Sequence, residues 1–251
     1  GRFLMQFNFY MNYRWSMSLD TSSFEAPCAC TNQSFPVDQR EERGPSDFDV
    51  AHAFTASGTW ELPFFTDQTK LKGKLLGGWQ ISGIVTHHTG FPWTPKLFGC
   101  LSGNTSSSNN FCDPRPTFYN GNQPLSNSNE NFLSPGGIFP GGGDDYFNTS
   151  VPFNANPFTQ RPGIGRNRFR GPKYFALDMT FAKQFGLGDW GFLGENAKID
   201  VRFNFFNILN NLNLAPFNSN SDPTRVTLNQ FGTAVSGLSG RVGEFQIRFS
   251  F

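Results

Sequence analysis

Apolar and polar residues alternate along the last eleven residues of the chain, Arg241 to Phe251. Side chains of a β-strand point to opposite faces with a period of two, so this pattern predicts a strand with one apolar and one polar face. Glu244 and Arg248 lie on the polar face. The apolar positions are Phe245, Ile247, Phe249 and Phe251.

The same alternation recurs in five earlier segments. The six predicted strands are residues 3–19, 48–64, 77–91, 173–185, 197–209 and 241–251. Most of them exceed the ~9–11 residues that a tilted strand needs to cross a bilayer. In strict up-and-down order, the short links 65–76 and 186–196 fall at one end. The long links 20–47, 92–172 and 210–240 fall at the other end, as in outer-membrane barrels, which have short periplasmic turns and long extracellular loops.

These patterns predict an all-β fold, an antiparallel up-and-down transmembrane β-barrel. Six strands cannot close such a barrel, because the smallest have about 8. An open sheet edge in lipid would leave unpaired backbone groups that cost several kcal/mol each. We therefore expect the chain to be a C-terminal fragment with long extracellular loops, and further strands to precede Gly1. Assembly of several chains is the less favoured alternative.

Composition agrees with a membrane barrel. The chain has 31 Phe against 8 Val and 7 Ile, so its apolar surface is aromatic rather than β-branched. A mean hydropathy of −0.40 fits a fold whose lumen and loops are polar. The sequence has no run of about 18 apolar residues, so it predicts no transmembrane helix. The net charge of +1 gives no electrostatic reason to expect nucleic acid as a partner.

Charged residues on the polar faces are the candidates for lining the lumen. One function for them is to line a substrate path, and the other, which we favour, is to pack the wall against an internal domain. The lumen-lining candidates are Arg14, Asp178, Lys198, Asp200, Arg202, Glu244 and Arg248.

The cysteines all fall in the predicted outer loops. Four thiols in an oxidising compartment most often pair as disulfides, either Cys100 with Cys112 or across loops with Cys28 and Cys30. A zinc site is the alternative, but the spacing is not the usual ligand pattern. His87 and His88 are adjacent and face opposite sides of a strand, so they cannot share one site. We expect no cofactor, and no catalytic constellation suggests an enzyme.

Aromatic residues in the long link 92–172 are the candidates for contacting a ligand. The main candidates are Trp93, Phe118, Tyr119 and Tyr146. Such rings can stack on a sugar or an apolar ligand. They can equally form a small core that keeps an outer loop folded, and the sequence leaves both alternatives open.

Three blocks of sequence resemble a known family. The first block is Asp47–His52 with Trp60–Pro63, Gly78–Gly83 and Thr89–Thr94. The second is Gly165–Pro172 with Leu177–Asp178 and Ala182–Lys183. The third is Arg202–Asn210 with the aromatic terminus. Together they resemble the C-terminal barrel of TonB-dependent outer-membrane receptors. The nearest resemblance is to the Oar-like group, which often carries an N-terminal carboxypeptidase-regulatory-like domain.

The resemblance implies a barrel of about 22 strands, an internal plug and a TonB-binding box upstream. It implies energised uptake of a bulky nutrient, whether a siderophore, a glycan or a peptide. The implied partners are outer-membrane lipid, the TonB complex through the plug, an unknown nutrient ligand, and a barrel-assembly machinery that reads the terminal strand. The alternatives are a passive porin or adhesin barrel, and a soluble β-sandwich that binds carbohydrate.

Overall fold

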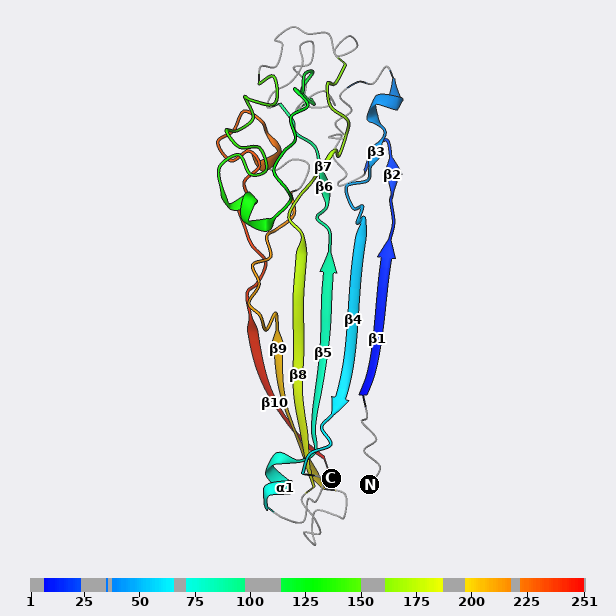
Figure 1. Cartoon of the computed structure of the whole chain (residues 1–251), viewed down its shortest axis with the longest axis vertical. Coiled ribbons are helices and arrows are strands. Elements are labelled where there is room, and N and C mark those ends of the chain that lie inside the picture. Colours follow the sequence, from blue (N-terminus) through cyan, green and yellow to red (C-terminus); the bar gives the residue numbers. More distant parts are fainter. Residues whose placement is uncertain are drawn as a thin grey trace.

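The computed structural model describes residues 7–23, 35, 38–65, 71–97, 114–149, 161–186, 197–217 and 222–250. Its main feature is one six-stranded sheet with the strand order β1-β4-β5-β8-β9-β10 (Figure 1). Every neighbouring pair is antiparallel, and the sheet is open, with β1 and β10 at its edges. The strands are β1 (Phe7–Trp15), β4 (His52–Glu61), β5 (Trp79–His88), β8 (Tyr174–Gly186), β9 (Lys198–Phe206) and β10 (Val242–Ser250). The all-β, up-and-down prediction is therefore confirmed.

The strand register places nearly all large apolar residues of the sheet on one face. Residues directly opposite each other in an antiparallel pair share a face. One such row runs from Met11 on β1 through Ala56, Val85 and Leu177. Another runs through Phe181, Phe203 and Phe245. We call this side the apolar face and the opposite side, which carries Asn, Ser, Thr and charged residues, the polar face.

The first predicted strand was too long. It leaves the main sheet at Trp15, and Leu19–Asp20 (β2) pairs with Gly44–Pro45 (β3) in a separate two-stranded sheet. The strand β1 ends at Trp15 because its partner β4 begins only at His52. Beyond that point, the side chain of Asp49 accepts a hydrogen bond from the backbone of Ser18 at 2.7 Å. The other strands are within a few residues of their predicted limits, and Phe251 lies outside the described residues.

Among the described residues of the apolar face, Lys183 is the one Lys, Arg, Asp or Glu. It lies near the end of β8, opposite Trp79, and is buried. Its ammonium donates to the carbonyl of Gly77 and lies 5.7 Å from the ring centre of Trp79 and 5.0 Å from that of Phe185. A lysine stem can cover apolar surface while its charge reaches polar groups at a membrane boundary. The residue therefore lies near the short-link end of the apolar face, one row before Phe185, Ile199 and Phe249.

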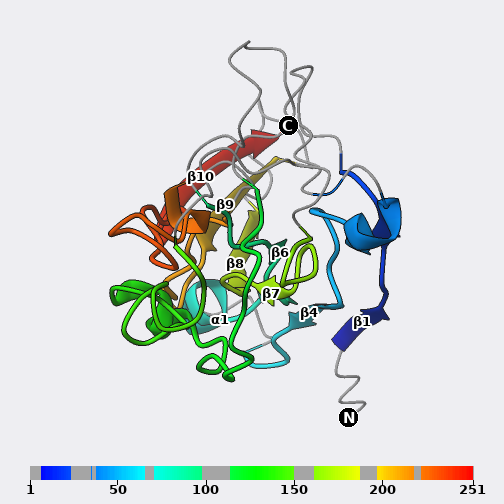
Figure 2. The same cartoon turned by 90° about the horizontal axis from the view of Figure 1, so that it is seen from above.

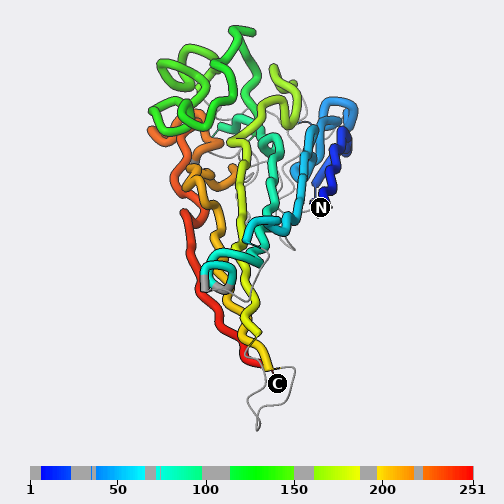
Figure 3. Tube along the Cα trace, turned by 60° about the horizontal axis from the view of Figure 1, so that its bottom comes forward, coloured from blue at the N-terminus to red at the C-terminus, as the bar shows by residue number. Residues whose placement is uncertain are grey.

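The links gather at the two ends of the sheet as expected. The short-link end carries α1 (Leu71–Leu76), while the long links lie together at the opposite end (Figures 1 and 3). Their short elements are η1 (Gln39–Glu42), β6 (Pro92–Trp93) paired with β7 (Phe169–Arg170), η2 (Asn129–Leu133) and η3 (Asp222–Thr224). We call this assembly, residues 19–50, 92–97, 114–149, 161–173 and 207–241 as far as described, the loop domain.

Asparagine side chains complete the edge of β8 where it extends beyond β9. Asn213 accepts from the backbone N–H of Phe175 and donates to its carbonyl, both at 2.9 Å. Asn129 does the same for Lys173, at 2.9 and 2.8 Å. Ile208 donates from its backbone to the carbonyl of Leu177. Amide side chains thus take the place of a strand at the long-link end of β8 and at Lys173, the residue before it.

A new charge should destabilise the barrel when it is placed on the apolar face but not when it is placed on the polar face. We expect Val85→Arg, in the middle of the apolar face, to lower the free energy of unfolding of the complete barrel by about 2–4 kcal/mol in a bilayer. Thr86→Arg, one residue along on the polar face, is the matched control and should have little effect. Guanidinium unfolding in lipid vesicles measures both. Equal losses would contradict the assignment of faces.

Candidate functional site

The polar face is the hollow side of the sheet. Seen from above, the six strands follow an arc (Figure 2). A hollow of about 610 Å³ lies along the middle of its polar side, bordered by Asn8, Tyr10, Ser82, Thr180 and Asn204 among others. A second hollow of about 410 Å³ lies nearer the short-link end and is bordered by Glu61, Asp200 and Arg202. The polar side chains therefore line a trough that runs along the strands.

All seven predicted lumen-lining residues lie on this polar face. Four of them, Lys198, Asp200, Arg202 and Arg248, gather toward the short-link end, where Arg248 is directly opposite Asp200. Arg14 lies apart from them in the row of His88 and Tyr174.

Individual contacts anchor several of these side chains. Asp200 accepts a hydrogen bond from Gln184 at 2.9 Å. Asp178 accepts from the backbone N–H of Asn207 at 2.8 Å, so its carboxylate holds the turn after β9. Glu244 is opposite Asn204 on the exposed edge strand β10.

An aromatic core holds the loop domain together. Trp93 is at its centre, with edge-on ring contacts to Phe139 at 6.0 Å, Phe217 at 5.3 Å and Phe231 at 5.8 Å. These rings come from the second and third long links. The backbones of the two links also meet directly at Gly137 and Gly232: both have positive φ, and a Cβ on Gly137 would lie 1.9 Å from the carbonyl oxygen of Gly232.

The predicted ligand-contact rings divide between this core and the surface. Trp93 and Tyr146 are only 2% and 9% exposed. These two rings therefore belong to the core of the loop domain, which was the second of the two alternatives. Tyr119 stacks on Phe147 at 5.2 Å, and burial raises the pKa of its phenol. Phe118 alone among the four is exposed, at 57%.

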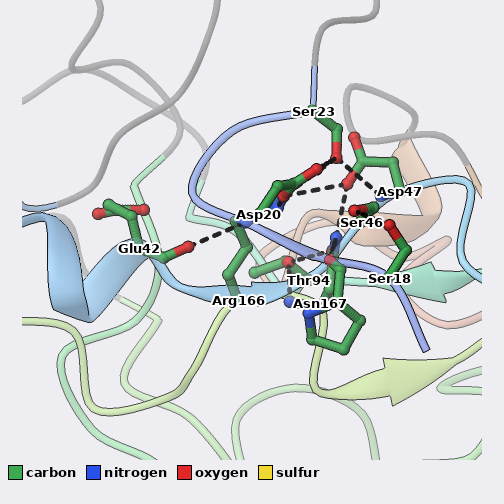
Figure 4. A network of polar contacts seen from close by, with 10 residues as sticks. Ser18, Asp20, Ser23, Glu42, Ser46, Asp47, Thr94, Arg166 and Asn167 are labelled. Carbon is green, nitrogen blue, oxygen red and sulfur yellow. Dashed lines mark hydrogen bonds and ion pairs between the residues drawn. The ribbon is translucent and has the colours of Figure 1, made fainter.

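Arg166 and Asn167 tie the first long link to the second (Figure 4). Arg166 forms ion pairs with Asp20 and with Asp47, the latter at 3.4 Å, and donates to the carbonyl of Glu42. The next residue, Asn167, adopts a left-handed conformation with φ 54° and donates to the Pro45 carbonyl at 2.7 Å. Burial lowers the pKa of the Arg166 guanidinium. These contacts fix the first link to the second.

A buried ion pair lies next to this network. Arg115 and Glu42 are 2.8 Å apart, with side chains 3% and 1% exposed. Arg115 also donates to the carbonyls of Ile164 and Glu41, and Glu42 accepts from the backbone of Phe35. Burial lowers the pKa of Arg115, and the adjacent Glu42 opposes that shift.

Sequence reasoning assigned no role to these arginines or their partners. The basic run Gly165–Pro172 was the available signal for Arg166 and Arg170, of which Arg170 pairs with Asp49. No local pattern indicates Arg115 or Glu42, because their contact joins links far apart in the sequence.

Other candidate chemistry gains no support from the described parts of the chain. Cys28, Cys30, Cys100 and Cys112 lie outside the described residues, so their pairing stays a prediction. Among the residues that the structure describes, no three His, Cys, Asp or Glu side chains gather in a way that could hold a metal ion. None of the described helices has the length and apolar character to cross a membrane.

Comparison with protein families decides what this sheet is. The model of the outer membrane beta barrel domain matches residues 1–247. The chain belongs to this family. Searches of curated proteins and of solved structures gave no match.

Membership in the outer membrane beta barrel family locates the protein in the outer membrane. It assigns the apolar face to lipid and the trough to the barrel interior. In outer-membrane barrels the long loops are extracellular, so the loop domain lies on the cell surface.

The buried ion pair in the loop domain can be tested by neighbouring isosteric changes. Glu42→Gln leaves the charge of Arg115 buried without its carboxylate, and we expect the loop domain to lose about 3–5 kcal/mol of stability. Glu41→Gln is the control, because the Glu41–Arg161 pair is exposed and 3.8 Å apart. Such pairs contribute roughly 0–1 kcal/mol. Limited proteolysis at increasing urea reports on the loop domain, and equal protease resistance of the two variants would contradict the assignment.

Proposed function

We propose that this chain is part of the barrel of a TonB-dependent receptor that imports a bulky nutrient across the outer membrane. The proposal rests on one observation: a polar trough and a packed loop domain occur together in the same wall. A polar trough runs along the strands, and three long links form a packed loop domain at its outer end. A passive pore needs only the trough, whereas a receptor also needs a folded surface that can meet a ligand outside the cell.

The reason to propose that uptake is driven by energy is the resemblance of the sequence to TonB-dependent receptors. The blocks around Asp47–His52, Gly165–Pro172 and Arg202–Asn210 resemble TonB-dependent receptors. Two contacts join residues of these blocks: Arg166 pairs with Asp47 within the loop domain, and Asn207 donates to Asp178 where the loop domain meets the wall. In the proposal, an internal plug fills the barrel and the TonB complex acts on that plug from the periplasm. This chain supplies wall and surface loops and carries out no catalysis.

The open sheet supports a larger barrel. The outer edges of β1 and β10 have no partner among the described strands. In lipid their free N–H and C=O groups need pairing, and strands from the same polypeptide provide it at the lowest entropic cost. A passive porin or adhesin barrel has the same requirement, so only the dependence on energy separates it from a receptor.

Growth of defined strains tests the energised function even while the nutrient is unidentified. A strain lacking the complete receptor, a strain lacking TonB and the parent strain are grown on a panel of single sources of iron, carbon and nitrogen. We expect every defect of the receptor mutant to recur in the TonB mutant. A defect that the TonB mutant does not share would indicate passive passage and exclude the proposal.

The terminal strand should control assembly of the barrel. Phe245, Ile247 and Phe249 are exposed on β10, whose free edge can pair with a strand of an assembly machinery. We expect removal of Phe251 from the complete receptor to lower the amount of folded protein in the outer membrane severalfold, measured by heat-modifiable gel mobility. Ser250→Ala is the control, since it alters the polar face only. Unchanged levels after loss of Phe251 would show that the aromatic terminus is not recognised.

A further inference from the structure

The helix α1 lies at the short-link end of the sheet (Figure 1), and two side chains hold its C-terminal end on the lipid side. The ammonium of Lys183 donates to the carbonyl of Gly77, the residue after the helix. The indole N–H of Trp79 donates to the carbonyl of Leu75 at 3.2 Å. Both side chains project from the apolar face, where Trp79 and Lys183 are directly opposite each other. The end of α1 is therefore outside the trough.

The backbone of the link also fixes α1 to the wall. The N–H of Gly77 donates to the carbonyl of Gly73 at 2.9 Å, and Gly78 turns the chain into β5 with a φ of 71°. Gly77 lies so close to the Phe65 carbonyl that a Cβ there would not fit. Glycine is needed at such a close approach and at a positive φ. The position of α1 thus follows from the path of the chain as well as from the two side chains.

The end of α1 is level with the last described apolar row of the sheet. That row is Phe185, Ile199 and Phe249, one row beyond Lys183. The Lys183 ammonium, which bonds to Gly77, is 5.0 Å from the ring centre of Phe185. A lysine that covers apolar surface with its stem and reaches polar groups with its charge is typical of a membrane boundary.

The link exposes apolar and basic side chains together. Leu75 and Leu76 of α1 are 56% and 53% exposed, and Phe64 and Phe65, just after β4, are exposed to the same degree. Lys72 on α1 is also exposed, and the helix sequence has two lysines and no acidic residue. Exposed leucines next to lysines on a short helix are out of place in water but suit the interface of a bilayer.

We infer that α1 lies in the periplasmic leaflet of the outer membrane and binds anionic phospholipid. Leu75 and Leu76 enter the acyl layer, and Lys72 reaches the phosphate groups. Lipid is the occupant because α1 lies on the side of the wall that meets lipid, level with its last apolar row, and because the charge of the helix complements anionic headgroups. The inference depends on the barrel family and holds for a receptor and for a passive barrel alike.

The depth of α1 is tested in the complete protein in lipid nanodiscs, which leave both sides of the bilayer open to solution. A fluorescent amino acid replaces Leu76 or, as the matched control, Phe118 in the loop domain, which is similarly exposed at 57%. We expect nitroxide-labelled lipid to quench position 76 about threefold more strongly than position 118, and aqueous iodide to show the opposite order. Equal quenching at the two positions, or protection of position 76 from both quenchers, would overturn the inference.

The preference for anionic lipid is tested with the nitroxide on phosphatidylglycerol or on phosphatidylcholine at the same mole fraction. We expect phosphatidylglycerol to quench position 76 roughly two- to fivefold more strongly. Lys72→Gln combined with Lys74→Gln should bring this ratio close to one, because the attraction to the headgroups is lost. Lys173→Gln, at the opposite end of the sheet, is the control and should leave the ratio unchanged. A ratio near one in the unaltered protein, or a ratio that survives loss of both lysines, would refute binding of anionic lipid by α1.

Discussion

Backbone hydrogen bonding away from water is the constraint on which this structure depends. Each N–H and C=O group that faces lipid must find a partner within the protein, because the hydrocarbon offers none. Along most of the sheet the antiparallel ladder meets this need. Outside the band that faces lipid, where β8 extends beyond β9, amide side chains of Asn129 and Asn213 bond to the backbone of Lys173 and Phe175, and these asparagines come from the second and third long links. The loop domain therefore begins as the completion of a strand edge.

The same ladder produces the division between lipid and lumen. Because opposite residues share a face, a strand with period-two alternation keeps its apolar side chains on one surface only if its neighbours hold the matching register. The register does so across all six strands, from Met11 on β1 to Phe245 on β10. Lys183 is tolerated on the lipid side because it is buried near the short-link end of the sheet and its ammonium reaches the Gly77 carbonyl. The polar face is then free to vary along its length, with few charges in the middle and more toward the short links.

The loop domain uses a different means of stability. Outside the membrane it has an ordinary core, in which Trp93 contacts rings from two links, and the buried Arg115 and half-buried Arg166 hold the first link against the second. A buried ion pair adds little net stability over an apolar pair, but loss of either partner is costly. Such contacts favour one arrangement of the links over others. A packed outer surface above a polar trough is the combination on which the proposed receptor function rests.

The sequence by itself determined which segments are strands and which side of each strand meets lipid. Alternation is a local property, so all seven charged candidates for the lumen fall on one face whichever strands become neighbours. The limits of a strand depend on its neighbour, and the first strand ends at Trp15 because β4 begins at His52. Only the tertiary structure decided that Trp93 and Tyr146 are core rings, that Glu42 meets Arg115, and that Tyr10 and Ile84 share one row. Those outcomes depend on contacts between residues far apart in the chain, and the spacing of residues along a sequence does not record them.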